Sequence, residues 1–135
     1  MRDGKTRKRP SAGGAPRLDD FLDLYVARVT LLSGPSAGAG FAIDRERVIV
    51  GRGPGVDRAF DDPAMSRQHA AIEFCGTGFR LRDLGSTNGT LLNGTQVQSA
   101  ELRHGDRFEI GGQRFVLAIE ERETEPDTYE LKSSS

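Results

Sequence analysis

Short runs of β-forming residues, separated by turn residues at intervals of about ten positions, constrain the fold of this chain most strongly. Glycine, proline, asparagine and aspartate interrupt the region from Tyr25 to Ile119 so often that a helix of ordinary length has no room. The pattern is typical of an antiparallel β-sandwich or β-barrel. We predict nine strands, at Tyr25–Leu32, Gly40–Ile43, Val48–Gly51, Ala70–Phe74, Gly78–Asp83, Thr90–Leu92, Thr95–Val97, Arg107–Ile110 and Gln113–Ile119.

Alternation within the runs indicates which faces are buried. Phe79 and Leu81 alternate with arginines, as expected for a strand with one side in the core and the other in water. Asn93-Gly94 and Gly111-Gly112 fit two-residue hairpin loops because these residue types tolerate positive φ. Ahead of the first strand, Asp19–Leu24 fits a short turn of helix.

The charge distribution divides the chain into a central domain and two tails. The 135 residues suit one domain, and the formal net charge of -1 gives no sign of a nucleic-acid or membrane partner. Residues 1–17 hold six basic residues against one acidic residue, and residues 120–135 hold six acidic residues against two basic ones. We therefore predict a basic disordered tail at residues 1–20, a folded domain at 21–120 and an acidic disordered tail at 121–135.

The single cysteine and the apolar pattern bear on the compartment. Cys75 is the only cysteine, so the chain has no intrachain disulfide and no sign of an oxidising compartment. The apolar core of a signal peptide does not follow the basic N-terminus, and no run approaches the ~20 apolar residues that span a bilayer. We predict a cytoplasmic protein. Because Cys75 follows a β run, we expect its side chain to be packed rather than reactive.

Three polar motifs stand at the ends of predicted strands, where loops can meet. They combine guanidinium, hydroxyl and amide donors, the mixture that suits a phosphate group, because its oxygens gain most from charge-assisted hydrogen bonds. The set lacks the nucleophile, base and orienting group of a catalytic site, so we interpret it as an anion clamp. Its candidate residues are Arg52, Ser66, Arg67, Thr87 and Asn88.

In order and spacing the motifs resemble the signature of the forkhead-associated (FHA) domain, a module that binds phosphothreonine peptides. The resemblance covers about Tyr25 to Ile119 and is carried by Gly51-Arg52, Ser66-Arg67-Gln68-His69, Asp83–Thr90 and Leu102–Gly111. It implies an all-β fold, an eleven-stranded antiparallel β-sandwich that binds peptide with the loops at one end. At least two strands must then lie in segments that the residue pattern leaves as loops.

The resemblance also implies a role for each site residue. Arg52 and Ser66 would bind the phosphate with help from Thr87 and Arg67, and Asn88 would hydrogen-bond the peptide backbone. The residues that would shape the site are Gly51, His69 and Gly89. His69 would do so by packing and hydrogen bonding under the loop that holds Ser66, and Gly89 by permitting a tight turn.

The function implied is non-enzymatic docking onto threonine-phosphorylated proteins in kinase signalling. A Ser/Thr kinase or its substrates are the expected partners, and no cofactor is expected. One alternative is a phosphate-independent interaction or self-association domain, motivated by the basic run Lys5–Arg9, which would bind acidic partners; its lack of aromatic residues disfavours nucleic acid. An enzyme is disfavoured because Ser66 and His69 have no evident acidic orienting residue, and no metal is expected because His69 and His104 lack ligand companions.

Two details depart from the family pattern or extend it. Arg58 interrupts an expected apolar stretch, and we interpret it as a solvated loop residue, with a basic group near the site as the alternative. Asp127 follows Thr124 by three residues, and Leu131 follows Thr128 by three residues. FHA domains commonly recognise the residue at this position after a phosphothreonine. Either threonine, once phosphorylated, could bring the tail back onto the site; a disordered acidic tail is the alternative.

Overall fold

The computed structural model describes residues 16–122 and has one short helix and eleven strands there. The elements are α1 (Leu18–Leu24), β1 (Tyr25–Leu31), β2 (Gly40–Ala42), β3 (Arg47–Gly51), β4 (Arg58–Ala59), β5 (Ala70–Phe74), β6 (Phe79–Asp83), β7 (Thr90–Leu92), β8 (Thr95–Val97), β9 (Ser99–Leu102), β10 (Arg107–Ile110) and β11 (Gln113–Glu121). The eleven strands confirm the number that the FHA resemblance implies. The nine predicted runs all form strands, with ends shifted by two residues at most.

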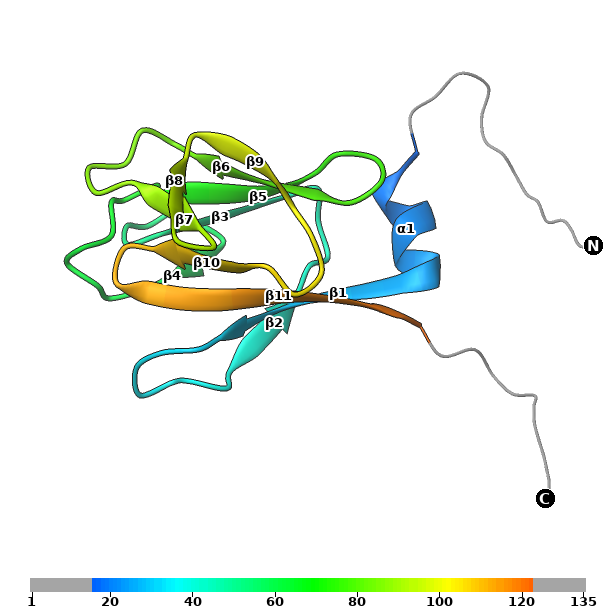
Figure 1. The fold of residues 1–135 in the computed structure, drawn as a ribbon, viewed down its shortest axis with the longest axis horizontal. Coiled ribbons are helices and arrows are strands. Elements are labelled where there is room, and N and C mark those ends of the chain that lie inside the picture. Colours follow the sequence, from blue (N-terminus) through cyan, green and yellow to red (C-terminus); the bar gives the residue numbers. More distant parts are fainter. Residues whose placement is uncertain (1–15, 123–135) are drawn as a thin grey trace, which may run out of the picture.

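The strands form two sheets that pack face to face (Figure 1). The six-stranded sheet has the order β2-β1-β11-β10-β7-β8, and the five-stranded sheet has the order β4-β3-β5-β6-β9. All paired strands are antiparallel except β3 and β4, which make a short parallel contact. The pairing of β1 with β11 joins the two ends of the domain, with Tyr25 opposite Glu121 and Leu31 opposite Phe115.

The two strands that the residue pattern missed are β4 and β9. β4 has only two residues, both exposed, and β9 fully buries only Leu102, so neither shows a clear apolar alternation. Arg58 therefore lies in a strand, which corrects its interpretation as a loop residue. Its guanidinium carbon lies 4.4 Å from the centroid of the Phe41 ring, a cation–π contact that links β4 to β2.

The core is built from the inward residues of both sheets. Phe79, Phe108 and Phe115 are each 0 to 1% exposed, and the rings of Phe108 and Phe115 stack with centroids 5.2 Å apart. Leu81 and Phe79 are buried while the arginines between and after them are exposed, which confirms the predicted alternation of β6. Each large apolar side chain buried here stabilises the fold by roughly 1.5–3 kcal/mol.

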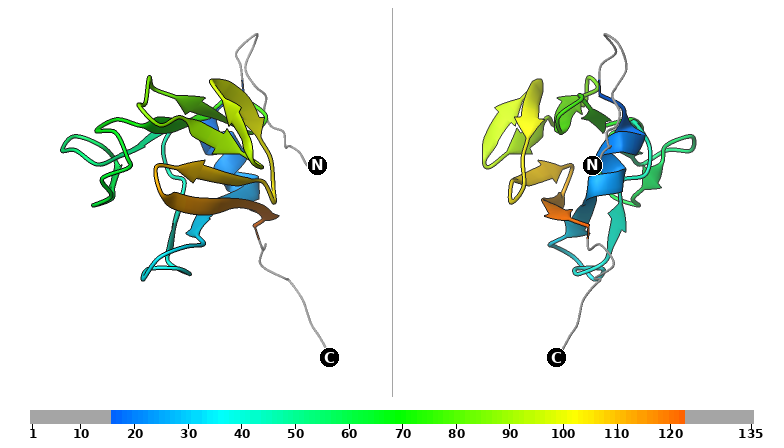
Figure 2. Two further views of the ribbon diagram at one scale, coloured as in Figure 1. Left: turned by 60° about the vertical axis from the view of Figure 1, so that its left-hand side comes forward. Right: turned by 90° about the vertical axis from the view of Figure 1, so that its right-hand side faces the viewer.

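Helix α1 confirms the short helix expected before the first strand, and it covers one end of the sandwich (Figures 1 and 2). Leu18 is 5% exposed and belongs to the core. The ring centroid of Phe21 lies 4.9 Å from that of Tyr25, 5.6 Å from that of Phe74 and 5.4 Å from that of Phe79. Aromatic packing therefore anchors a helix of seven residues, too short to be stable by itself.

Both predicted two-residue hairpin loops are confirmed. Leu92 pairs with Thr95 across Asn93 and Gly94, whose φ angles are 49° and 88°. Two successive positive φ angles are typical of the turn that matches the twist of a β-hairpin. The β10–β11 hairpin likewise turns at Gly111, with φ of 62°.

The prediction that Cys75 packs in the structure is wrong, because its side chain is exposed. β5 ends at Phe74, and the backbone N–H of Cys75 donates to the Gly78 carbonyl at 2.8 Å, which starts the turn into β6. A residue in this turn no longer alternates between core and solvent.

The predicted tails meet secondary structure at both boundaries. α1 begins at Leu18 and β11 ends at Glu121, so the last part of the predicted basic tail and the first residue of the predicted acidic tail belong to regular elements. The described residues do not include 1–15 or 123–135, where Lys5–Arg9, Thr124 and Thr128 lie. The predictions on those residues stay predictions.

Candidate functional site

The site lies at the end of the sandwich away from α1, where two connections meet (Figure 1). One connection runs from the end of β3 to the start of β5, and the other from the end of β6 to the start of β7. The Arg52 N–H donates to the Ser66 carbonyl at 3.0 Å, which holds the two ends of the first connection together. The Thr87 N–H donates to Ser66 Oγ at 3.1 Å, which ties the second connection to the first.

Arg52 is held by its own backbone neighbours and offers the rest of its side chain to solvent. Its Nε donates to the Met65 carbonyl at 2.9 Å, so the two terminal guanidinium nitrogens are not used in this bond. Within residues 16–122 no carboxylate lies within 4.0 Å of the Arg52 guanidinium. A fixed guanidinium with a planar pair of free nitrogens is suited to grip a phosphate or carboxylate.

Ser66 is half-buried, and its hydroxyl oxygen already accepts the Thr87 N–H. Because that bond uses only a lone pair, the hydroxyl hydrogen is free to donate to an anion. The backbone N–H of Ser66 is engaged below, where it donates to Nδ1 of His69 at 3.0 Å. The side chain of Ser66 is therefore oriented from two sides.

His69 is 0% exposed and bridges the two connections from beneath. Its Nδ1 accepts the Ser66 N–H, and its Nε2 lies 2.8 Å from the Gly89 carbonyl. A carbonyl only accepts, so Nε2 donates and the neutral ring satisfies both bonds. His69 therefore ties the backbone at Ser66 to the backbone at Gly89.

The close approach of two backbones requires Gly51. A Cβ atom at Gly51 would lie 1.9 Å from the Arg67 carbonyl oxygen, a distance that no side chain tolerates. At Gly53 a Cβ would lie 3.2 Å from Cβ and Cγ of Arg67, so the stem of that arginine passes over the glycine. Arg67 is exposed and, like Arg52, has no carboxylate within 4.0 Å among the described residues.

Asn88 and Gly89 form the opposite side of the site. The Asn88 side-chain amide donates to the Ala64 carbonyl at 2.8 Å, which leaves its own carbonyl oxygen and one N–H for a ligand. Gly89 has φ of 86°, in the left-handed region that favours glycine, and a Cβ there would lie 2.8 Å from Nε2 of Gln96. The contacts among these two connections thus bring all eight residues predicted for the site together.

Two aspartates that the motif analysis did not assign to the site hold its loops in place. Asp62 is 8% exposed and accepts N–H bonds from Ala64 at 2.9 Å and Gly112 at 2.8 Å, and one from the Gln113 side chain at 3.0 Å. These donors lower the pKa of Asp62, with the Ala64 N–H contributing most. Asp62 therefore fastens the loop before Ser66 to the β10–β11 hairpin.

Asp83 organises the other connection. Its carboxylate accepts the N–H groups of Gly85 and Ser86, the Ser86 hydroxyl, and the Thr90 hydroxyl at 2.7 Å. Burial alone raises the pKa of Asp83, but the hydrogen bonds from Ser86 and Thr90 and from the backbone outweigh it and lower the pKa. In the sequence Asp83 opens the Asp83–Thr90 motif, and an aspartate shortly before a Gly-Ser turn is a common local acceptor.

Neither a metal site nor a membrane-spanning helix is found among the described residues. Between residues 16 and 122 no three histidine, cysteine or acidic side chains gather as metal ligands. The single helix of that range is too short and too polar to be a candidate membrane span.

The fold and the site together define a class of protein: a β-sandwich whose loops at one end hold guanidinium, hydroxyl and amide groups with donors left for an anion. The FHA domain family model matches residues 48–111, a range that contains every residue of the site. The chain belongs to the FHA domain family.

Similar proteins support this assignment. Over 91 residues the chain is 40% identical to the glycogen accumulation regulator GarA of Mycolicibacterium smegmatis, covering 67% of this chain and 58% of GarA. Over 113 residues it is 36% identical to the oxoglutarate dehydrogenase inhibitor of Corynebacterium efficiens, covering 82% and 80%. A structure solved in a study of phosphothreonine-dependent FHA domain interactions superimposes with a TM-score of 0.63 at 30% identity, covering 69% of this chain and 95% of that one.

For several relatives the chain matches only part of the relative's length. The chain spans 58 to 63% of the length of the first five, GarA proteins among them. Their activities therefore describe proteins longer than the shared region.

Proposed function

We propose that this chain is a docking module that binds threonine-phosphorylated segments of other proteins through the loops around Ser66, without catalysing a reaction. The observation that carries the proposal is the pairing of Arg52 and Ser66. The backbone orients both, and both have donors left for an anion. A phosphothreonine carries close to two negative charges and three strong acceptor oxygens, which match these donors.

The phosphate contacts divide among four residues. Arg52 supplies a two-pronged charged contact through its terminal nitrogens, and Ser66 donates its hydroxyl hydrogen. Arg67 adds a second positive charge from the exposed side of the loop, and Thr87 adds a hydroxyl next to Ser66. Neither arginine must first leave a carboxylate of residues 16–122, so phosphate binding breaks no ion pair there.

The peptide backbone is recognised by Asn88. Its amide is already oriented by the Ala64 carbonyl, and its free oxygen and N–H match one acceptor and one donor of an extended peptide. Gly51, His69 and Gly89 keep the two connections at the spacing that this contact needs.

We infer that the partners are substrates of a Ser/Thr kinase, or the kinase itself. Two relatives are named as a regulator and an inhibitor, which supports a regulatory outcome in which docking changes the activity of the partner. The chain's own contribution is then recognition rather than chemistry.

Isothermal calorimetry with matched peptides tests the proposal. Phosphothreonine peptides from a degenerate library should bind, and their unphosphorylated forms should not. Arg52→Ala removes one or two charge-assisted bonds, each worth roughly 1.5–3 kcal/mol, so the affinity should fall about tenfold to several hundredfold. Ser66→Ala and Asn88→Ala should weaken binding with the fold intact.

Arg28→Ala is the matched control, because Arg28 is also an exposed arginine and lies on β1. It should leave the affinity unchanged. Equal binding of phosphorylated and unphosphorylated peptides, unaffected by Arg52→Ala, would refute a phosphate-dependent function.

A further inference from the structure

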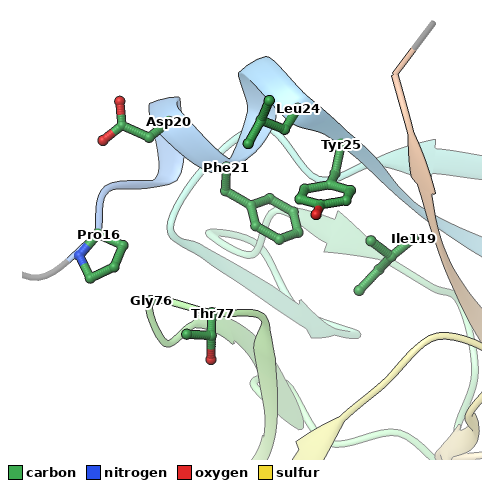
Figure 3. A pocket seen from close by; sticks show the side chains of 8 residues that line it. All are labelled: Pro16, Asp20, Phe21, Leu24, Tyr25, Gly76, Thr77 and Ile119. Atoms are coloured by element: carbon green, nitrogen blue, oxygen red, sulfur yellow. The ribbon is translucent and has the colours of Figure 1, made fainter. Parts of the chain in front are cut away.

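A recess lies at the end of the sandwich opposite the Ser66 loops, between α1 and the turn that joins β5 to β6 (Figure 3). Its volume is about 420 Å³, within the range of roughly 300–1,000 Å³ typical of binding sites. The lining is mostly apolar. It consists of Pro16, Asp20, Phe21, Leu24, Tyr25, Gly76, Thr77 and Ile119, and we call it the helix-end groove.

The helix-end groove leaves apolar surface uncovered. Two large hydrophobic side chains are exposed among residues 16–122, and Leu24, at 63%, is more exposed than the other. Figure 3 shows Phe21 and Tyr25 next to it, with Ile119 beyond Tyr25 and Thr77 across the opening. Since Phe21 packs on the core aromatics, one wall of the groove is rigid, and Leu24 stands out from it toward solvent. Such a preformed apolar surface is suited to an inserted side chain.

The rim of the groove is acidic. Asp20 lines it, Asp23 is exposed on the same helix, and Glu121 pairs with Tyr25, one of the lining residues. Among residues 16–122 these carboxylates have no cation within 4.0 Å. Two basic side chains contact this helix. Arg17 at its N-cap has its Nη2 3.7 Å from Oδ2 of Asp19, and Arg122 donates its Nε–H to the carbonyl of Leu22 at 2.8 Å.

We propose that the helix-end groove docks a segment of a partner protein in which one large apolar side chain is flanked by lysine or arginine. The apolar side chain covers Leu24 and Ile119, and the flanking cations approach Asp20 and Glu121. A second copy of this chain fits less well, because two grooves facing each other would bring like charges together.

The helix-end groove and the Ser66 loops can be occupied at the same time. β5 starts next to His69 and ends before the turn of Gly76 and Thr77, and its five residues at about 3.3 Å each separate the two ends. β11 likewise runs from the hairpin that Asp62 contacts to Ile119 in the groove. A phosphorylated partner and a basic, apolar partner could thus be held together by one domain.

A display library of short random peptides, selected on the full chain, tests the proposal. The selected peptides should carry one large apolar residue beside lysine or arginine. Leu24→Ser should weaken their binding by about tenfold, the value expected for losing much of one leucine contact, and Asp20→Lys should weaken it further. Higher ionic strength should also reduce the affinity.

Two controls separate this site from the phosphopeptide site. Leu32→Ser removes the other exposed large hydrophobic side chain, 41% exposed, and should leave the binding of the selected peptides unchanged. Arg52→Ala should also leave it unchanged, whereas Leu24→Ser should not alter phosphopeptide affinity. Because Leu24 is exposed, Leu24→Ser should keep the melting temperature of the parent chain.

Three results would overturn the proposal. The first is selection of peptides that lack basic residues or bind Leu24→Ser equally well. The second is a change of oligomeric state on Leu24→Ser in light scattering, which would make the groove a contact between copies. The third is binding that appears only after residues 1–15 are removed, which would make the chain's own basic segment the occupant.

Discussion

The two ends of the sandwich are built by different physical means. At the Ser66 end, backbone and polar side-chain hydrogen bonds fix the loops, and glycines allow backbones to touch. At the α1 end, apolar contacts between aromatic rings hold the helix on the core. Hydrogen bonds are directional and apolar contacts are not, so the first end fixes atoms in place while the second tolerates change.

The difference teaches where a substitution should affect binding and where it should affect only stability. A displaced donor at the Ser66 end loses the ligand geometry even when the fold survives. A lost ring at the α1 end removes stabilising burial but leaves the distant loops in place. Four substitutions test this division, and the expected loss of stability decreases from one to the next.

Gly51→Ala should have the largest effect. Its Cβ would clash with the Arg67 carbonyl, so the backbone of β3 or of the Ser66 loop must move; we expect a loss of about 3 kcal/mol in unfolding free energy and no measurable phosphopeptide binding. Gly78→Ala is the control, because a Cβ there has nothing within 4 Å and φ is not positive. Chemical denaturation measures the unfolding free energy of both variants. Similar values for the two would contradict the claim that the close backbone approach requires glycine at position 51.

Phe21→Ala should reduce the unfolding free energy by about 2 kcal/mol, because it removes a partly buried ring from the aromatic cluster under α1. Phosphopeptide affinity, measured by calorimetry below the melting temperature, should stay within twofold of the parent chain. A large loss of affinity in a folded Phe21→Ala protein would show that the two ends are coupled.

Asp62→Asn should cost about 1–2 kcal/mol at pH 7, because the amide replaces a charged acceptor with a weaker one. The pKa of Asp62 is lowered in the folded chain, so its contribution to stability is complete above the ordinary carboxyl pKa and is lost as the pH falls through the lowered one. Denaturation curves from pH 7 down to acid should therefore converge for the two proteins. Curves that stay parallel would assign the loss to packing instead.

Cys75→Ser should have the smallest effect, within about 0.5 kcal/mol, because the side chain is exposed in the turn between β5 and β6. Phosphopeptide binding should not change. A destabilisation comparable to that of Phe21→Ala would mean that the turn contributes to the core.

Local patterns predicted most of the fold. The alternation in β6 and the loop Asn93-Gly94 are encoded by neighbouring residues, so their strands and turn follow from the sequence. β4 was missed because two exposed residues carry no alternation, and the pairing that creates the strand comes from β3. Strand order likewise depends on long-range contacts that no local pattern contains.

The sequence predicts those parts of the site that are clustered in local motifs, but not the contacts between distant positions. The motif residues around Ser66 and Asn88 are clustered in sequence and match a family signature, so they could be assigned. The bond from the Gly112 N–H to Asp62 joins positions 50 residues apart, and only the folded chain reveals it. The helix-end groove also has no sequence signal, because Leu24 and Ile119 come to line one recess only when β1 and β11 pair.

The pairing of β1 with β11 has a consequence for biosynthesis. β1 is an interior strand of its sheet, yet the neighbour on one side is β11, which leaves the ribosome after the other ten described strands. Until residue 121 emerges, the edge of β1 that later pairs with β11 has unpaired backbone groups, which are sites for intermolecular strand pairing. Closure of the sheet must therefore follow translation of β11, and a nascent chain that stalls before it is the form most exposed to aggregation and most in need of a chaperone.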